Sequence, residues 1–304
     1  MERRKSMKLI IRADDVGYTP VHNLGTFETI EHGVVTSADI MLDCPGTVDA
    51  LEKLTKYPWI STGWHAHFWG APVLDPKDVP TLYDPERKGF RKNLTRLEDV
   101  DFDEALAECR AELDRCVAIL GKAPDVGGGM GGGNTPMSRA MQQVIAEYGM
   151  ATNYMEPPEF IRKYIKDPSQ IPVRDPKYPK IVSGSVAAFD DLETDSIKGI
   201  TKYDPIAYYL EDKGGLLSME EDAIVMNAWH PGYVDYFVYQ EGDYGPNALN
   251  YIAIRTVDVH ALTSPEVRNW IKEHKIELVN FRDALYGRRE YQNHLRSVGS
   301  DLTV

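Results

Sequence analysis

The chain has 304 residues, and 47 Asp and Glu against 34 Lys and Arg give it a formal net charge of −13. This acidic balance argues against a nucleic-acid backbone or an anionic membrane surface as a partner. No apolar run is long enough to span a bilayer. The short run Leu9–Ile11 is broken at once by Arg12, so it is no signal peptide, and we expect a cytoplasmic protein.

The sequence contains three cysteines, Cys44, Cys109 and Cys116, with no CxxC pair among them. An odd number of widely spaced cysteines does not form a disulfide framework. We therefore expect buried, free thiols in a reducing compartment.

Strand-like and helix-like segments alternate from the start of the chain. In the first third, strands are expected at Lys8–Arg12, Ala38–Leu42 and Ile60–His67, and helices at Val21–His32 and Thr47–Lys56. The clearest helical pattern follows at Asp103–Leu120, with Asp103 as the expected N-cap and Gly121 as the stop. The later expected elements are a helix at Met137–Tyr148, a strand at Ala223–Asn227, a helix at Pro265–His274 and a strand at Ile276–Asn280.

Such alternation predicts parallel strands joined by crossover helices, which is the α/β class. We expect one (β/α)-barrel domain over residues 1–304. Residues about 155–220 are rich in Pro, Lys and Asp and have weak periodicity. They are interpreted as an insertion or lid rather than a second domain.

Two adjacent carboxylates, Asp14 and Asp15, follow the first expected strand. Functional side chains of parallel α/β folds gather at the carboxyl ends of strands. Two neighbouring carboxylates repel each other, and a bound cation or a raised pKa relieves that repulsion. The structural alternative is a turn in which the aspartates cap the next segment.

His65 and His67 stand at the end of the third expected strand. Alternate residues of a strand share a face, so both rings could reach one site, and imidazole is a common ligand of divalent transition metals. The alternative is a single inward histidine bonded to a backbone carbonyl. His230 follows another strand, where it could protonate a leaving amine or stabilise an oxyanion. Together these groups point to a metal-assisted hydrolase.

Around these residues the sequence resembles the YdjC/ChbG family of carbohydrate deacetylases. The resemblance is carried, in chain order, by Ile11–Gly17, His32–Ser37, Gly63–His65, Gly70–Val73, His230–Tyr233, Arg255, Leu262–Val267, Ile276–Leu278 and Phe281–Asp283. Residues about 155–220 lie outside it. The resemblance implies an incomplete or distorted barrel of about seven or eight strands. It also implies a divalent metal, Mg or Zn, and hydrolysis of the N-acetyl groups of sugars.

The resemblance also implies a role for each motif residue. Asp14 would be the general base, Asp15 and His65 the metal ligands, and His230 the acid, while Arg255 would position groups in the site. The chain departs from the family after the long central helix. There the family carries a histidine-rich segment with one further ligand, and residues 124–136 contain six glycines and no histidine.

Three residues are candidate substitutes for that missing ligand: His67, Asp125 and Asn134. The carbonyl oxygen of Asn suits magnesium or calcium better than zinc. Three other outcomes remain open. The metal could bind weakly through Asp15 and His65 and require substrate to complete its shell. The protein could instead be a carbohydrate-binding relative that has lost hydrolysis, or a metal-independent enzyme with Asp14 and His230 as base and acid.

Aromatic side chains next to the motifs are candidate platforms for a sugar ring, since aromatic faces stack on sugars. The sugar-binding candidates are Trp64, Trp229 and Tyr233, and core packing is the alternative for each. A small-molecule carbohydrate is therefore the expected partner. A homodimer is the expected assembly, because cyclic pairs are the commonest one, although no segment marks an interface.

Overall fold

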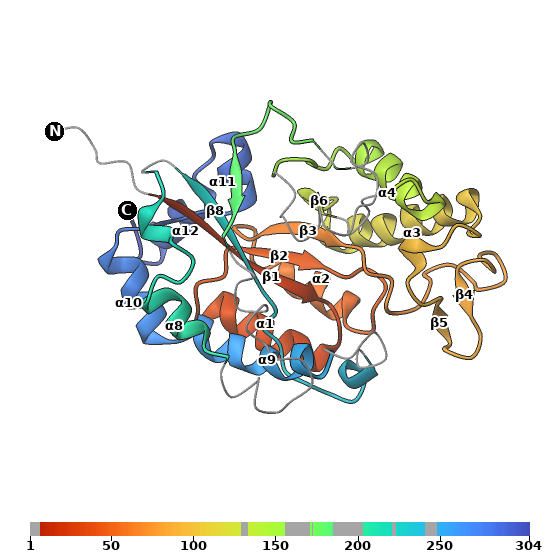
Figure 1. The fold of residues 1–304 in the computed structure, drawn as a ribbon, viewed down its shortest axis with the longest axis horizontal. Helices are drawn as coiled ribbons and strands as arrows, with labels where there is room; N and C mark the ends of the chain where they lie inside the picture. Colours follow the sequence, from red (N-terminus) through yellow and green to blue (C-terminus); the bar gives the residue numbers. More distant parts are fainter. Residues whose placement is uncertain are drawn as a thin grey trace.

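The computed structural model describes residues 7–128, 133–155, 171, 173–184, 203–220, 223–240 and 248–304. Its centre is a curled parallel sheet with the strand order β6-β3-β2-β1-β8-β7, and β9 pairs with the start of β1 (Figure 1). The strands are β1 (Lys8–Val16), β2 (Ser37–Ile40), β3 (Ser61–His65), β6 (Val126–Gly128), β7 (Ile181–Ser183), β8 (Ile224–Trp229) and β9 (Glu277–Leu278).

The gap between the two outer strands, β6 and β7, is bridged by the segment Ala151–Met155. Ala151 forms a single parallel bridge with Val126, and Met155 forms one with Ile181. The N–H of Gly127 also donates to the carbonyl of Ala151 at 2.8 Å. Single bridges in place of full ladders leave the ring only partly closed, so the predicted α/β class and incomplete barrel are confirmed.

Helices surround the sheet (Figure 1). They are α1 (Pro20–Glu31), α2 (Thr47–Leu54), α3 (Phe102–Leu120), α4 (Pro136–Glu147), α8 (Pro205–Leu210), α9 (Ala248–Leu262), α10 (Pro265–Glu273), α11 (Phe281–Tyr286) and α12 (Glu290–Ser297). Short 3-10 turns lie at Leu94–Arg96 and Leu216–Ser218, and a hairpin of β4 (Tyr83–Asp84) and β5 (Gly89–Phe90) is separate from the main sheet. None of the helices described is both long and apolar enough to cross a membrane.

The expected helices and strands are all present, with shifted ends. Thr19 caps α1 by accepting from the N–H of His22, and Gly121 ends α3 in the left-handed conformation. The predicted N-cap Asp103 is wrong. Asp101 caps α3 instead, because its carboxylate accepts the N–H groups of Asp103 and Glu104. The three cysteines are buried free thiols, as expected.

Alternate residues of each strand point to opposite sides of the barrel wall. On β1, Leu9 and Ile11 pack outward in the large core shared with the helices. Ile10 packs inward with Met226 of β8 and with Phe281 of α11. Since α11 closes the amino-terminal end of the barrel with apolar side chains, the polar residues of the interior lie toward the carboxyl end.

The predicted insertion or lid at about 155–220 lies mostly outside the described residues. The described part supplies β7, which pairs with β8 in the main sheet, and α8, which packs against α10 and α9.

Candidate active site

Polar side chains follow the apolar ones along the inward face of the barrel. On β1, Arg12 and Asp14 continue the inward row begun by Ile10, and on β8 the inward row of Met226 and Ala228 leads to His230. The carboxyl ends of parallel strands meet at one edge of the sheet, where active sites of such folds lie. Four of the predicted site residues, Asp14, Asp15, His65 and His230, therefore lie at the carboxyl end of the barrel, where the sequence places the site.

A β-bulge turns both carboxylates of the Asp14–Asp15 pair into the site. Between Ala13 and Val16, β1 advances three residues while its partner β2 advances two, from Ala38 to Ile40. Asp15 takes a φ of 60°, which is uncommon for a residue other than glycine. Bulges of this kind redirect a side chain and are frequent beside active sites.

Asp14 is held by a guanidinium group. The Nε and Nη2 atoms of Arg12 donate to its two oxygens at 2.6 and 2.8 Å. Burial alone would raise the pKa of Asp14, but Arg12, His65 and His230 together outweigh it, so the pKa lies below its ordinary value. Asp14 is therefore an ionised carboxylate in a fixed orientation.

Asp15 is paired with Arg255, whose side chain is fully buried. The Nη2 atom of Arg255 donates to Oδ2 of Asp15 at 2.7 Å, and its Nη1 atom lies 3.2 Å from Nε2 of His22. Burial would raise the pKa of Asp15, but Arg255 and the His65 contact hold it well below its usual range. The other carboxylate oxygen, Oδ1, is buried and faces His65.

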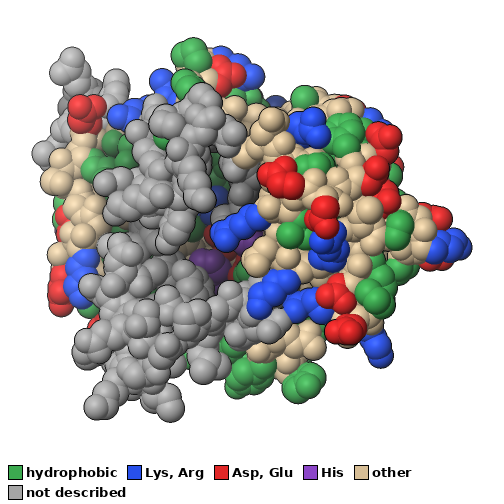
Figure 2. Space-filling view, turned by 45° about the vertical axis from the view of Figure 1, so that its right-hand side comes forward, with side chains coloured by type: hydrophobic (Ala, Val, Ile, Leu, Met, Phe, Trp, Pro, Cys, Tyr) green, Lys and Arg blue, Asp and Glu red, His purple; other side chains and the backbone are tan. Residues whose placement is uncertain are grey.

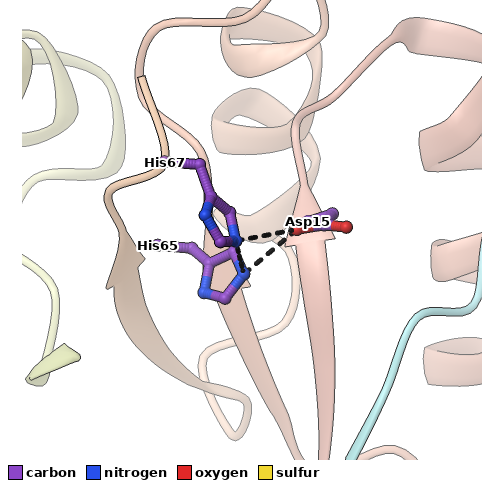
Figure 3. A group of neighbouring side chains, drawn as sticks. All are labelled: Asp15, His65 and His67. Atoms are coloured by element: carbon purple, nitrogen blue, oxygen red, sulfur yellow. Dashed lines mark hydrogen bonds and ion pairs between the residues drawn. The ribbon is translucent and has the colours of Figure 1, made fainter. Parts of the chain in front are cut away.

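Two imidazoles face that Oδ1 atom of Asp15 (Figure 3). Nε2 of His65 lies 3.0 Å from it and Nε2 of His67 lies 3.6 Å from it, and the two Nε2 atoms are 2.7 Å apart. His67 reaches this place because the chain turns after β3, where the N–H of His67 donates to the carbonyl of His65 at 3.0 Å.

The far nitrogen of His65 faces another buried carboxylate. Nδ1 of His65 lies 3.7 Å from Oδ2 of Asp39 in β2, and Nη1 of Arg12 lies 3.3 Å from the same oxygen. Gly63 makes room for Asp39, since a Cβ atom there would lie 2.0 Å from its Oδ1 atom. A carboxylate behind a metal-binding histidine is a frequent arrangement, because it fixes the ring and increases its basicity.

The group Asp15, His65 and His67 fits a divalent ion. Their ligand atoms all lie within 4.8 Å of one another. Ligands held at 2.0–2.1 Å from a tetrahedral ion lie about 3.3 Å apart. The distances from Oδ1 of Asp15 to the two imidazoles, 3.0 and 3.6 Å, lie on either side of this value, and the 2.7 Å between the two Nε2 atoms is a hydrogen-bond distance. The carboxylates around His65 outweigh burial and raise its pKa to about 10. The site therefore attracts positive charge.

His230 lies on the other side of Asp14. Its Nε2 atom is 4.0 Å from Oδ2 of Asp14, and its backbone N–H donates to Asp258 at 2.8 Å. The Tyr203 hydroxyl donates to the other oxygen of Asp258 at 2.6 Å. Burial lowers the pKa of His230, so its ring is neutral when the free protein is near neutral pH.

Asp125, one of the predicted substitutes, lies at the opposite end of the barrel. It precedes β6, and it accepts from the N–H of Thr62 at 2.9 Å and from Arg282 of α11 at 2.5 Å. Its carboxylate is thus engaged at the amino end, and the prediction that it is a metal ligand is wrong. Asn134 is exposed, just before the N-cap of α4.

Trp64 and Trp229 do not face the site. Each is adjacent in sequence to a histidine whose ring points inward, so each indole points outward into the helix layer. The indole N–H of Trp64 donates to Glu112 at 3.0 Å, and that of Trp229 donates to the Tyr209 hydroxyl at 3.0 Å. Both are 0–1% exposed, so neither can stack on a sugar here, and this part of the prediction is corrected.

Tyr233 is half-buried, and its hydroxyl donates to Glu28 of α1. Figure 2 shows histidine side chains at the base of a hollow on this side of the molecule, with Lys or Arg side chains beside it. The site is therefore recessed but visible from the surface.

Four residues of the cluster have no assigned role from the sequence: Arg12, His22, Asp39 and Asp258. A charged residue within an apolar strand pattern was the available signal for Arg12 and Asp39. Nothing local marks His22 or Asp258, because each comes from a helix and meets the site only through packing.

An incomplete (β/α) barrel thus brings buried carboxylates and imidazoles that could hold a metal ion to the carboxyl ends of its strands. The family model described as YdjC-like protein matches residues 8–273, and the chain belongs to this family.

Named proteins are similar over nearly the whole chain. A carbohydrate deacetylase of Brevibacillus brevis is 28% identical over 284 residues, which are 91% of this chain and 99% of that protein. A carbohydrate deacetylase of Listeria monocytogenes serotype 4a is 26% identical over 288 residues, 91% of this chain and 100% of that protein. A crystal structure from Enterococcus faecalis, provisionally named for cellobiose-phosphate cleavage, superimposes with a TM-score of 0.65 at 21% identity, covering 92% of this chain and 99% of that one. This last similarity concerns the fold.

Proposed function

We propose that this protein is a metal-dependent hydrolase that removes acetyl groups from N-acetylated sugars. The observation that carries the proposal is the convergence of Asp15, His65 and His67 beside the ionised Asp14. Membership of the YdjC-like family and the named deacetylases that match the chain support the same reaction.

In this proposal Asp15 and His65 hold a divalent ion. Such an ion polarises an acetyl carbonyl and lowers the pKa of water. Arg255 positions Asp15 by engaging Oδ2, which leaves Oδ1 directed toward the two histidines. Asp39 orients His65 from behind.

Asp14 acts as the general base and takes a proton from the attacking water. Arg12 keeps this carboxylate ionised and fixes its direction, although the lowered pKa also makes it a weaker base. His230 is neutral in the free protein, so it must first gain a proton before it can donate one. Its Nε2 atom, 4.0 Å from Asp14, is placed to receive that proton after a small movement and to pass it to the leaving amine nitrogen. The products are acetate and the free amine.

The test combines metal content with turnover. Protein purified without chelator should contain about one divalent ion per chain by elemental mass spectrometry, and His65→Ala should lose it. It should release acetate from short N-acetylglucosamine oligosaccharides, and a chelator should stop the release.

The alternatives give different outcomes in the same experiment. Sugar binding without acetate release would make the protein a carbohydrate-binding relative. Acetate release that a chelator does not affect would make it a metal-independent enzyme that uses Asp14 and His230.

A further inference from the structure

We infer that His67 is the third protein ligand of the metal site, so that this chain supplies its second imidazole from the turn after β3 instead of from the strand next to it. The inference rests on the proposed metal site and specifies which residues complete it. It begins with β6, where the resemblance predicts a histidine and the chain has glycine.

β6 lies directly beside β3 in the sheet. Gly128 is the register partner of His65, and Gly127 is that of Trp64. The glycine-containing strand therefore runs alongside the histidine at the centre of the site. Neither glycine has a ligand atom in its side chain, so these positions of β6 contribute no side-chain ligand.

His67 is in a suitable position to do so. Its Nε2 atom lies 2.7 Å from that of His65 and 3.6 Å from Oδ1 of Asp15. The distance to Asp15 is close to that between two ligands of one ion, and the distance to His65 is that of a hydrogen bond between the rings, which a bound ion would replace. The Oδ1 atom of Asp15 is buried and faces both imidazoles, with Nε2 of His65 3.0 Å away, so the three possible ligand atoms lie close together.

The His67 ring is also held in place. It stacks on Trp69, with 4.2 Å between ring centroids and 9° between ring planes. Phe68, which lies between them in sequence, takes a φ of 57° and packs edge-on against Trp64 and Phe90. This packing fixes the turn that brings His67 back over the end of β3.

The types of ligand are suitable as well. The resulting set of two imidazoles and one carboxylate suits zinc and similar transition ions better than magnesium.

The experiment titrates metal-free protein with zinc in competition with a chromophoric chelator, and it requires no sugar. The diagnostic variant is His67→Phe, which keeps a ring to stack on Trp69 but has no ligand nitrogen. The matched control is His260→Phe, at an exposed position on α9. Thermal unfolding of the metal-free proteins verifies that both variants fold.

We expect the zinc affinity of His67→Phe to fall by at least about 100-fold, the upper end of what loss of an outer-shell partner costs. His260→Phe should keep the wild-type affinity. Added imidazole should restore zinc binding to the smaller variant His67→Ala, because the free ligand can occupy the vacated space.

Wild-type zinc affinity in His67→Phe would overturn the inference and assign His67 a packing role, while the deacetylase proposal would stand. Loss of zinc affinity without acetate release by the wild type would support the inference and refute the proposed reaction. A wild-type protein that binds no zinc would also overturn the inference about His67.

Discussion

Arg12 donates to both carboxylate oxygens of Asp14, at 2.6 and 2.8 Å, from two positions earlier on the same inward face of β1. The pair is local in sequence, yet it lies deep in the barrel beside His65 and His230. It fixes the carboxylate to which the proposal assigns the proton transfer from water.

Replacing Asp14 should therefore separate proton transfer from metal binding. In Asp14→Asn the amide cannot accept a proton, so acetate release should fall by at least about 100-fold, the lower end of the contribution of a general base. Zinc content should remain if the Asp15–His65–His67 group holds the ion, whereas loss of zinc would point to the second group of possible ligands, Asp14, Asp39 and His65. Steady-state kinetics with elemental analysis measures both quantities. Full activity of this variant would remove Asp14 from the mechanism.

Asp39 should affect the metal without touching it. Its Oδ2 atom lies 3.7 Å from Nδ1 of His65, so Asp39→Ala removes the group behind that ring. We expect zinc affinity to weaken about 10–100-fold, as for other outer-shell partners. Asp75→Ala, on the exposed surface, is the control. Equal affinities in the two variants would mean that Asp39 does not orient His65.

Arg255 and Asp15 form a buried ion pair whose loss should destabilise the fold. Arg255→Met leaves Asp15 without its buried partner, and breaking such a pair reduces the free energy of unfolding by about 3–5 kcal/mol. The control Arg110→Met breaks a surface pair with Glu147, whose loss should have a much smaller effect because water screens exposed charges. Urea unfolding of metal-free protein measures both. An equally small loss of stability in Arg255→Met and Arg110→Met would show that the buried pair of Arg255 and Asp15 contributes little to the free energy of unfolding.

Asp258 should make stability depend on pH. Burial raises its pKa from 3.8 to about 7, although Tyr203 and the N–H of His230 act in the opposite direction. The folded state thus binds a proton more tightly than the unfolded state. The contribution of Asp258 to stability therefore decreases as the pH rises from 3.8 to about 7, and it is constant at higher pH.

Asp258→Asn cannot ionise, so this pH dependence should disappear in the variant. The free energy of unfolding of the variant minus that of the wild type should increase from about pH 4 to pH 7 and then level off. Urea unfolding of the metal-free proteins across this range gives the difference. A constant difference would mean that Asp258 has an ordinary pKa in the folded protein.

Much of the fold could be predicted from local patterns. The period of α3 and its stop at Gly121 depend on contacts within a few residues, and so does the run of buried apolar residues that forms β1. The N-cap of α3 was misplaced by two residues because Asp101 and Asp103 are both acceptable caps, and the geometry of the turn decides between them.

The prediction that Trp64 and Trp229 stack on a sugar was wrong for a different reason. Trp64 and Trp229 are neighbours of His65 and His230 in sequence, but adjacent strand residues point to opposite sides of the wall. The two-residue period was already sufficient to place the indoles in the helix layer. Asp125 could not be excluded this way, since its distance from the site depends on the register of β6 against β3.

By itself, the sequence determined the α/β class and the strand ends at which Asp14, Asp15, His65 and His230 lie, because both follow from local periodicity and from motifs along the chain. Only the tertiary structure decided how these groups meet. The bulge that turns Asp15 inward, the turn that returns His67 over His65 and the approach of Arg255 from α9 all arise from packing between distant segments. Such contacts are set by the register of the strands and the closure of the barrel, which no short stretch of sequence encodes.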